Sequence, residues 1–226
     1  MQPGGRSGLP ALCPAEFFPA LDALAFVRTA FIQRCLDIEV VTDRETALTR
    51  LWLAHRQTAD ALGFSGMPFA LAEQVHGSGV ARVDAPSQVP APAADGLVTS
   101  RPQLCLAIYV ADCAAVYLAD KKTRSIGLVH AGKKGAQLGV VKQAIAAMQE
   151  QFGVDPRNLV MQISPCIRPP HYEVDFAADI VRQARGAGVQ AIFDCDTCTA
   201  CHPDLYYSYR REKGSTGRLL ALAAIS

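Results

Sequence analysis

The chain has 226 residues and a formal net charge of +1, and half of its residues are hydrophobic while 19% are charged. This composition excludes the disordered and fibrous classes, and the length suits one domain with a sizeable core. No run of consecutive basic residues exceeds a pair such as Lys121-Lys122, so the sequence offers no electrostatic footprint for nucleic acid or an anionic membrane. Small-molecule chemistry is therefore the favoured class of function.

The N-terminal segment and the cysteines are used to predict the cellular location of the protein. No apolar stretch approaches the ~20 residues that a membrane helix needs, and Pro10, Pro14 and Pro19 interrupt the N-terminal candidate. We therefore expect a cytoplasmic protein with reduced cysteines and no disulfide framework. The cysteines would then be core residues, metal ligands or catalytic groups.

The chain opens with a segment rich in Gly and Pro, which predicts a flexible lead-in. We place this lead-in over residues 1–24 and one folded domain over residues 25–226. The first element of the domain is a strand, predicted over Ala25–Gln33.

A helix is predicted next, because Thr42 followed three residues later by Glu45 is typical of a capping box. The helical pattern continues to about Leu62, and Gly63 would end it.

From Phe69 to His130 the pattern becomes that of strands, separated by a loop rich in Pro and Ala over residues 85–94. The predicted strands are Ala70–Val75, Val80–Val83, Leu104–Val110, Ala114–Ala119 and Ser125–His130. The remaining elements are a helix over Gln137–Gln151, a strand over Leu159–Ile163, a helix capped by Asp175 that runs to about Arg185, and a strand over Leu219–Ile225. This order predicts an α+β fold, a single domain of mixed sheets flanked by helices, rather than a regular βαβ winding.

Three residues at the ends of predicted strands carry metal-binding chemistry. His76 precedes a glycine turn, Cys113 lies at a corner between two strands, and His130 ends a strand before Ala131-Gly132. Two imidazoles and one thiolate suit zinc, and three protein ligands leave a fourth position open.

Other interpretations of these residues stay open on the pattern alone. Their spacing is not a compact metal signature, a histidine at a strand end is often only hydrogen-bonded, and a buried cysteine often acts as a small hydrophobe. The same residues also permit a cysteine hydrolase in which Cys113 is the nucleophile and a histidine is the base.

Several short motifs in order, from about Ala25 to the C-terminus, resemble those of one family. They are Glu73-Gln74-Val75-His76-Gly77, Ala94-Asp95-Gly96-Leu97, Ala111-Asp112-Cys113, Gly127-Leu128-Val129-His130-Ala131-Gly132, Ser164-Pro165-Cys166-Ile167, His171-Tyr172-Glu173-Val174, Ser208-Tyr209-Arg210-Arg211 and Thr216-Gly217-Arg218. The family is variously called YfiH-like, laccase-domain or polyphenol oxidase proteins, and its members are regarded as purine nucleoside phosphorylases with adenosine deaminase activity.

The resemblance implies a function. It assigns one zinc ion to His76, Cys113 and His130, with copper the less favoured metal, and it implies a purine nucleoside (adenosine, inosine or methylthioadenosine) and phosphate as substrates. Zinc lowers the pKa of a bound water toward about 7, which would supply hydroxide for deamination, while phosphorolysis needs cations that hold phosphate.

Two departures from the family pattern affect the substrate contacts. The usual Trp-Arg-Gly after His-Ala-Gly is replaced by Lys133-Lys134-Gly135, and a glycine-rich segment is shortened to residues 34–37. A lysine ammonium does not hold an anion with the fork geometry of arginine.

The substrate contacts and acid–base groups are assigned to polar residues in or near the motifs. The candidate substrate contacts are Arg56, Gln74, Lys133, Lys134 and Arg210, with Arg211 as a further cation. Each cation has the alternative of being an ordinary surface charge. Asp112 would orient a ligating imidazole and Asp95 would shuttle protons, although Asp95-Gly96 also suits a tight turn.

A cluster of Cys195, Cys198, Cys201 and His202 leaves open a second metal site or an iron–sulfur cluster. The sequence has no phosphate-binding loop, no dinucleotide fingerprint and no motif of the usual zinc deaminases. Two alternatives to a purine nucleoside enzyme remain: a copper-dependent polyphenol oxidoreductase, for which Met67 and Met161 are not visibly placed as axial ligands, and a non-catalytic zinc-stabilised binding protein.

Overall fold

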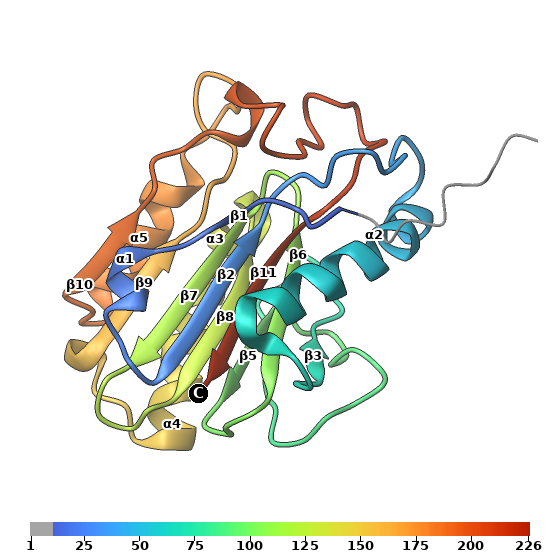
Figure 1. Cartoon of the computed structure of the whole chain (residues 1–226). Helices are drawn as coiled ribbons and strands as arrows, with labels where there is room; N and C mark the ends of the chain where they lie inside the picture. The colour runs from blue at the N-terminus through green and yellow to red at the C-terminus, as the bar shows by residue number, and fades with distance from the viewer. Residues whose placement is uncertain (1–10) are drawn as a thin grey trace, which may run out of the picture.

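The computed structural model describes residues 11–226, and within them all eleven strands belong to two stacked β-sheets (Figure 1). In spatial order, the five-stranded sheet contains β1 (Ala15–Glu16), β2 (Val27–Ile32), β11 (Leu219–Ile225), β6 (Cys105–Val110) and β3 (Phe69–Leu71). The six-stranded sheet contains β10 (Ala191–Asp194), β9 (Leu159–Ile163), β7 (Ala114–Asp120), β8 (Ile126–Ala131), β5 (Gly96–Thr99) and β4 (Val80–Arg82). The α-helices are α1 (Pro19–Asp22), α2 (Arg44–Ala59), α3 (Lys133–Gln137), α4 (Val140–Phe152) and α5 (Phe176–Gly186). The predicted α+β fold of mixed sheets flanked by helices is confirmed.

Two hydrophobic cores hold these layers together. The larger core joins α2 and the five-stranded sheet to the inner face of the six-stranded sheet, and the smaller core lies between the six-stranded sheet and α4 and α5. The Tyr117 hydroxyl on β7 donates a hydrogen bond of 2.9 Å to the Ala30 carbonyl on β2, inside the larger core. This bond ties the two sheets together directly.

The strand register places several chain segments at one edge of the two sheets. In the five-stranded sheet, the end of β6 pairs with the start of β11, Val110 opposite Leu219, and β3 runs parallel to β6. In the six-stranded sheet, the start of β7 pairs with the end of β8, Ala114 opposite Ala131, and the start of β5 lies beside the end of β8. The links β3–β4, β5–β6, β6–β7 and β10–β11 all cross between the sheets, and all of these except β5–β6 cross at this edge. A site at this edge therefore draws on both sheets.

Some elements differ from the sequence prediction for local reasons. The predicted strand 70–75 ends at Leu71, because Gln74 and His76 have φ of 63° and 59°, in the left-handed region. The predicted helix 137–151 is divided at Gly139, whose φ is 74°, and a short helix α3 already starts at Lys133. The strand β5 was not predicted, because its first residues suit a turn.

The two predicted helix caps had different outcomes. The Asp43 carboxylate accepts a hydrogen bond from the Thr46 amide at 3.0 Å and caps α2, so the predicted capping box of Thr42 and Glu45 was wrong. Asp175 caps α5 through the Ala178 amide, as predicted.

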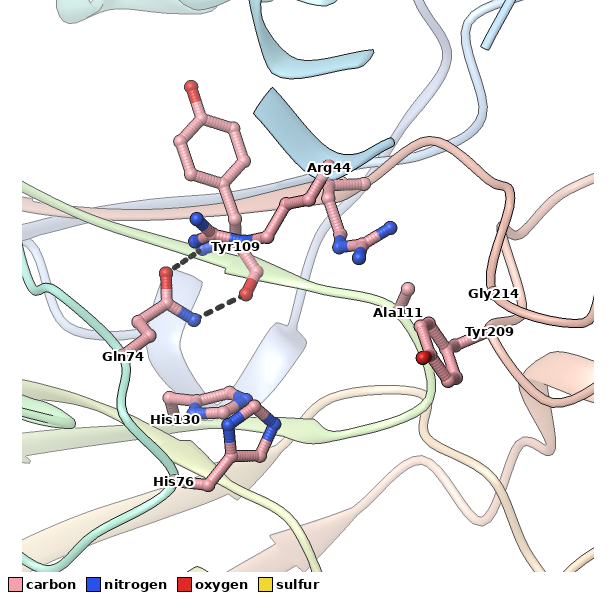
Figure 2. Close-up of a pocket in the computed structure, with 9 residues that line it drawn as sticks. Arg44, Gln74, His76, Tyr109, Ala111, His130, Tyr209 and Gly214 are labelled. Atoms are coloured by element: carbon pink, nitrogen blue, oxygen red, sulfur yellow. Dashed lines mark hydrogen bonds between the residues drawn. The ribbon is translucent and has the colours of Figure 1, made fainter. Parts of the chain in front are cut away.

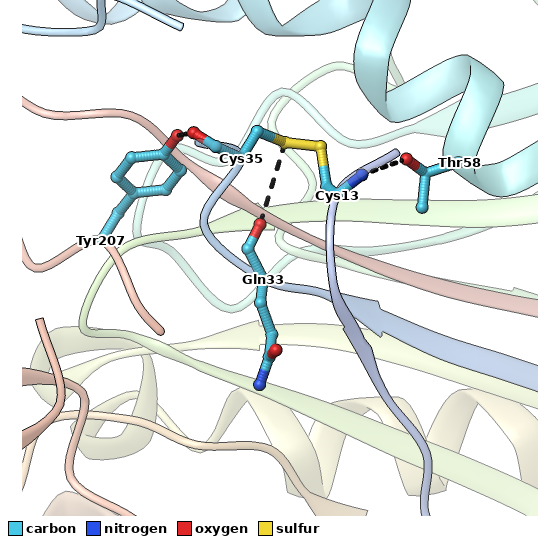
Figure 3. Close-up of a disulfide and its surroundings, with 5 residues drawn as sticks. All are labelled: Cys13, Gln33, Cys35, Thr58 and Tyr207. Carbon is cyan, nitrogen blue, oxygen red and sulfur yellow. Dashed lines mark hydrogen bonds between the residues drawn. A yellow bond between two sulfur atoms is a disulfide. The ribbon is translucent and has the colours of Figure 1, made fainter. Parts of the chain in front are cut away.

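The N-terminal segment is fixed by a disulfide between Cys13 and Cys35 (Figure 3). The expectation that no disulfide forms was therefore wrong, because the fold brings the two Cα atoms to 4.6 Å. Phe18 and Leu21 of the same segment are buried in the larger core. The predicted lead-in thus contributes β1, α1 and core side chains, while its residues 1–10 lie outside the described part of the chain.

Among residues 11–226, no helix is both long and apolar enough to cross a membrane. The cytoplasmic location stays a prediction.

Candidate functional site

His76, Cys113 and His130 converge at the edge where the chain passes between the sheets. Their donor atoms all lie within 4.8 Å of one another. The two imidazole rings meet edge to face, with centroids 4.8 Å apart and an interplanar angle of 83°. His76 comes from the β3–β4 link, Cys113 from the β6–β7 link and His130 from β8, so the three residues that the sequence grouped are brought together.

Asp95 lies behind this cluster and fixes two of its members. Its buried carboxylate accepts a hydrogen bond of 2.8 Å from Nδ1 of His130. It also accepts hydrogen bonds from the backbone amides of His76 and Gly77, at 2.9 and 2.7 Å. Burial would raise the pKa of Asp95, but the bond from His130 and those two amides hold it below its ordinary value. The carboxylate is therefore kept charged, and it directs Nε2 of His130 toward the cluster.

The same contacts shift the pKa values of Cys113 and His130. Burial would raise the pKa of the Cys113 thiol, but hydrogen bonds and charge from His130 and His76 outweigh burial and lower it to about 6. Burial would lower the pKa of His130, but bonding to Asp95 and Cys113 raises it to about 9. The cluster thus favours a thiolate next to imidazole groups, which is the donor set that binds a soft divalent metal.

The turn after β8 is shaped around the sulfur. A Cβ atom on Gly132 would lie 2.5 Å from Cys113 Sγ, so no other residue fits there without displacing the sulfur. Gly132 is also the N-cap of α3.

A pocket of about 400 Å³ opens on the histidine side of the cluster (Figure 2). Gln74 forms part of its wall, and its side-chain amide is held by two hydrogen bonds to the Tyr109 backbone, at 2.6 and 3.1 Å. The residues lining this pocket, called here the histidine-side pocket, are Arg44, Gln74, His76, Tyr109, Ala111, His130, Tyr209, Gly214 and Arg218.

A second pocket, of about 220 Å³, lies on the cysteine side and is richer in aromatic side chains. The residues lining this cysteine-side pocket are Ala111, Asp112, Cys113, Gly132, Lys133, Ile167, Tyr172, Phe176, Tyr209 and Arg210. Ala111 and Tyr209 belong to both pockets, so the two pockets flank one cluster of donors.

The cations named from the sequence have different environments. Lys133 and Arg210 line the cysteine-side pocket and share Glu173, with nitrogen–oxygen distances of 3.1 Å each. Lys134 is exposed and lines neither pocket. Arg56 also lies outside both: it donates to the Met67 carbonyl and stacks on Phe69.

Asp112 does not contact a histidine of the cluster. Its carboxylate accepts hydrogen bonds from the Thr199 hydroxyl, at 2.8 Å, and from the Arg210 backbone amide, at 2.6 Å. The role that the sequence suggested for Asp112, orienting an imidazole, is thus taken geometrically by Asp95. Asp112 instead holds two segments of the cysteine-side pocket together.

Arg44 and Arg218 are the pocket cations that the sequence did not indicate. Arg44 lies in the first turn of α2, outside every motif, and only the fold brings it to the pocket. Arg218 belongs to the Thr216-Gly217-Arg218 motif, which was a usable signal. Neither Met67 nor Met161, considered as axial ligands for copper, lines either pocket.

Comparisons with known proteins identify the family of the chain. The profile of the family described as multi-copper polyphenol oxidoreductase laccase matches residues 40–182 and 174–226. Among curated relatives, a purine nucleoside phosphorylase of Mycobacterium tuberculosis is 34% identical over 73% of this chain and 75% of its own length, and one of Corynebacterium glutamicum is 35% identical over 71% and 75%.

A solved structure shares the fold. The crystal structure of YlmD from Geobacillus stearothermophilus superimposes with a TM-score of 0.83 at 23% identity, covering 92% of this chain and 94% of that one. NMB0706 from Neisseria meningitidis gives a TM-score of 0.78 at 22% identity, covering 94% and 98%. From the profile match and the curated relatives, the chain belongs to the family described as multi-copper polyphenol oxidoreductase laccase, whose relatives here are named purine nucleoside phosphorylases.

Proposed function

We propose that this protein is a zinc-dependent purine nucleoside phosphorylase that also deaminates adenosine. The observation that carries the proposal is the position of the His76, Cys113 and His130 cluster between a cationic pocket and an aromatic pocket. The names of the curated relatives support a purine nucleoside and phosphate as the substrates.

The donor set fits zinc. The lowered pKa of Cys113 favours the thiolate, and Asp95 occupies Nδ1 of His130 so that Nε2 is free to bind. Three protein donors leave a further position for substrate. When bound, zinc would act as a Lewis acid that polarises an oxygen of the substrate or of water.

Phosphate suits the histidine-side pocket. Arg218 is 8% exposed and Arg44 lies near it, and burial together with the charge of Arg44 lowers the pKa of Arg218. Within residues 11–226, neither arginine forms a salt bridge with a carboxylate. Two adjacent guanidinium groups without an anionic partner favour a bound anion, and their fork geometry suits phosphate.

The purine base suits the cysteine-side pocket. Tyr172, Phe176 and Tyr209 supply aromatic walls, and Tyr172 and Phe176 meet edge to face at 5.9 Å. Lys133 and Arg210 at the rim are paired with Glu173, which makes them less available to phosphate. In this arrangement the sugar lies beside the donor cluster, and the Arg44 and Arg218 side holds phosphate against the anomeric carbon.

The proposal is tested with two variants of the phosphate site, Arg218→Lys and Arg44→Gln. Each removes charge-assisted bonds to an anion, so the KM for phosphate in nucleoside cleavage should rise by about 10- to 100-fold. Deamination of adenosine, which does not use phosphate, should change little. The control is Lys134→Ala, which removes an exposed cation outside both pockets and should leave both reactions unchanged.

An unchanged phosphate KM in both arginine variants would reject this phosphate site and return attention to Lys133 and Arg210.

A cysteine hydrolase is the rival that the geometry also supports, because Cys113, His130 and Asp95 form a chain of the nucleophile–base–carboxylate kind. His76 separates the two functions, since a nucleophile needs one base whereas a metal site uses both imidazoles. A His76→Ala variant should lose zinc and nucleoside cleavage together. Full nucleoside cleavage by zinc-free protein would favour the hydrolase.

The copper and non-catalytic alternatives have simple readouts. A thiolate–copper centre gives a strong visible colour, whereas zinc gives none. A protein that binds zinc but cleaves no nucleoside, with or without phosphate, would have a structural metal only.

A further inference from the structure

The cysteine cluster near residue 200 does not stay together in the fold. Cys195 points back to the sheet and its thiol donates to the Ile163 carbonyl at 3.1 Å. The His202 ring packs edge to face with Tyr206 at 6.4 Å. Cys198 and Cys201 instead converge with His171, which lies 27 and 30 residues earlier in the chain. The sequence could not indicate this set, because His171 comes from a different segment.

The distances within this set match a metal site. Nδ1 of His171 lies 3.5 Å from Cys201 Sγ and 3.9 Å from Cys198 Sγ, and all three donor atoms lie within 4.8 Å of one another. A tetrahedral zinc with bonds of ~2.0 Å to nitrogen and ~2.3 Å to sulfur places such ligand pairs about 3.5 Å apart. The three atoms therefore need little movement to share one ion.

The backbone around the set is fixed by the fold. Cys198 forms an isolated parallel bridge with Cys166, in which the Cys166 amide donates to the Thr197 carbonyl and the Thr199 amide donates to the Cys166 carbonyl, both at 3.1 Å. The Cys201 amide donates to the Cys198 carbonyl, also at 3.1 Å, so one short turn sets the spacing of the two sulfurs. Such a preformed scaffold lowers the entropic cost of binding an ion.

We propose that His171, Cys198 and Cys201 bind a second zinc ion, separate from the cluster of His76, Cys113 and His130. Cys198 is buried, whereas His171 and Cys201 are exposed, so the fourth position faces solvent and would hold water. Two thiolates and one neutral imidazole balance the charge of the ion, and their softness selects zinc over magnesium or calcium. None of the three ligands lines either substrate pocket, so the ion would have a structural role.

This ion would join two loops at one end of the molecule, drawn in orange near the top of Figure 1. One loop leads from His171 into Tyr172, which lines the cysteine-side pocket, and into Glu173, which forms ion pairs with two residues of that lining. The other loop holds Thr199, which donates a hydrogen bond to Asp112 of the same lining. The second zinc therefore fixes the wall of the proposed base pocket.

The test is a zinc count on the protein purified under reducing conditions. Cys201→Ser, at an exposed position that should not disturb the core, should lose about one equivalent of zinc per chain relative to wild type. Cys113→Ser should lose the other equivalent, and the double variant should retain almost none. The matched controls are Cys195→Ser and His202→Ala, which change neighbouring members of the same sequence cluster and should keep the wild-type zinc content.

Cobalt substitution gives a second readout that does not depend on activity. Cobalt(II) loaded into Cys113→Ser should still show thiolate charge-transfer absorption, because two thiolates remain at the proposed site. The further change Cys201→Ser should weaken this absorption strongly. Wild-type zinc content in Cys201→Ser would overturn the proposal, and so would a Cys198–Cys201 disulfide found by thiol counting in the freshly purified protein. Loss of nucleoside cleavage in Cys113→Ser bears on the proposed function alone.

Discussion

Asp95 and Asp112 are both buried carboxylates beside the donor cluster, but they have different partners. Asp95 bonds the ring of His130 and the backbone of His76, while Asp112 bonds Thr199 and Arg210. A carboxylate behind a metal-binding histidine fixes the tautomer and raises the basicity of the ligand. Only the first of these carboxylates is in that position.

Asp95→Asn should therefore weaken zinc binding by about 10- to 100-fold, because an amide bonds the His130 ring without a negative charge. The measurement is a titration against a competing chelator, with circular dichroism to show that the fold is kept. Asp112→Asn is the matched control and should keep nearly wild-type zinc affinity. Equal losses in the two variants would mean that charge alone, rather than the bond to His130, stabilises the ion.

His55 gives the protein a pH-dependent stability. It is fully buried on α2 and stacks on Tyr109, and neither ring nitrogen has a hydrogen-bond partner among the described residues. Burial lowers its pKa from 6.5 to about 3. Between these values the unfolded chain binds a proton that the native state does not. The contribution of His55 to the free energy of unfolding is therefore complete above about pH 6.5 and is lost as the pH falls toward 3.

His55→Phe, which keeps the aromatic contact, should reduce the loss of unfolding free energy at acid pH. The full loss attributed to His55 is of order 5 kcal/mol. Urea unfolding of both proteins at a series of pH values measures it. Parallel pH profiles for the wild type and the variant would show that other groups cause the acid lability.

At the scale of elements, the sequence predicted those whose evidence is local. The strands β6, β7, β8, β9 and β11 show as apolar runs bounded by turn residues, and α5 shows its periodicity and its cap. Errors occur where tertiary contacts decide. The residues 72–76 leave the strand because the segment must turn to bring His76 and its amide to Asp95, which lies far along the chain.

In the candidate site, too, local motifs indicated some residues and tertiary contacts decided the others. The three donor residues could be named from short motifs, because each motif fixes its own turn, but the motifs do not say which carboxylate faces which ring. Arg44 carries no motif, and it reaches the pocket only because α2 packs on the five-stranded sheet. His171 joins Cys198 and Cys201 only in the folded chain.

The turn between β8 and α3 offers a test at the scale of one element. Gly132 has φ of −106° and ψ of −170°, which any residue adopts, so its Ala variant suffers no backbone strain. The added Cβ would meet Cys113 Sγ at 2.5 Å and force the sulfur to rotate away from the two histidines. Gly132→Ala should thus lose zinc affinity at least about 10-fold while unfolding within about 1 kcal/mol of the wild type.

The control for this variant is Gly186→Ala at the end of α5, where an added Cβ meets nothing within 4 Å. It should keep the wild-type zinc affinity and, through the better helix propensity of Ala, gain up to about 1 kcal/mol of stability. Wild-type zinc affinity in Gly132→Ala would show that the sulfur has room that the structure does not indicate.

At the scale of the whole molecule, the Cys13–Cys35 disulfide ties the N-terminal segment to the end of β2. The Cys13 amide donates to the Thr58 hydroxyl on α2 at 2.9 Å, and the Tyr207 hydroxyl donates to the Cys35 carbonyl at 3.0 Å, so the bridge links segments from across the chain. A cross-link over 22 residues stabilises mainly by restricting the unfolded chain.

Cys13→Ser combined with Cys35→Ser should lower the free energy of unfolding by about 3 kcal/mol, the value expected for a loop of this size. Denaturant unfolding of oxidised wild type, reduced wild type and the double variant measures it. The reduced wild type should match the variant, and zinc content should be the same in all three, because the bridge lies outside both pockets. A reduced protein as stable as the oxidised one would contradict the expected contribution.

The passage of the chain between its two sheets has a consequence for motion. His76 and Cys113 lie on links that leave the five-stranded sheet, whereas His130 belongs to the six-stranded sheet. An ion held by all three would bind only when the two sheets are packed as in this structure, and it would stabilise that packing by about 2.7 kcal/mol when free zinc is 100 times Kd. Amide hydrogen exchange should therefore slow on zinc binding at the facing ends of β6 and β8 together, even though these strands belong to different sheets. Tyr117→Phe, which removes the bond between the sheets, should make that exchange more dependent on zinc.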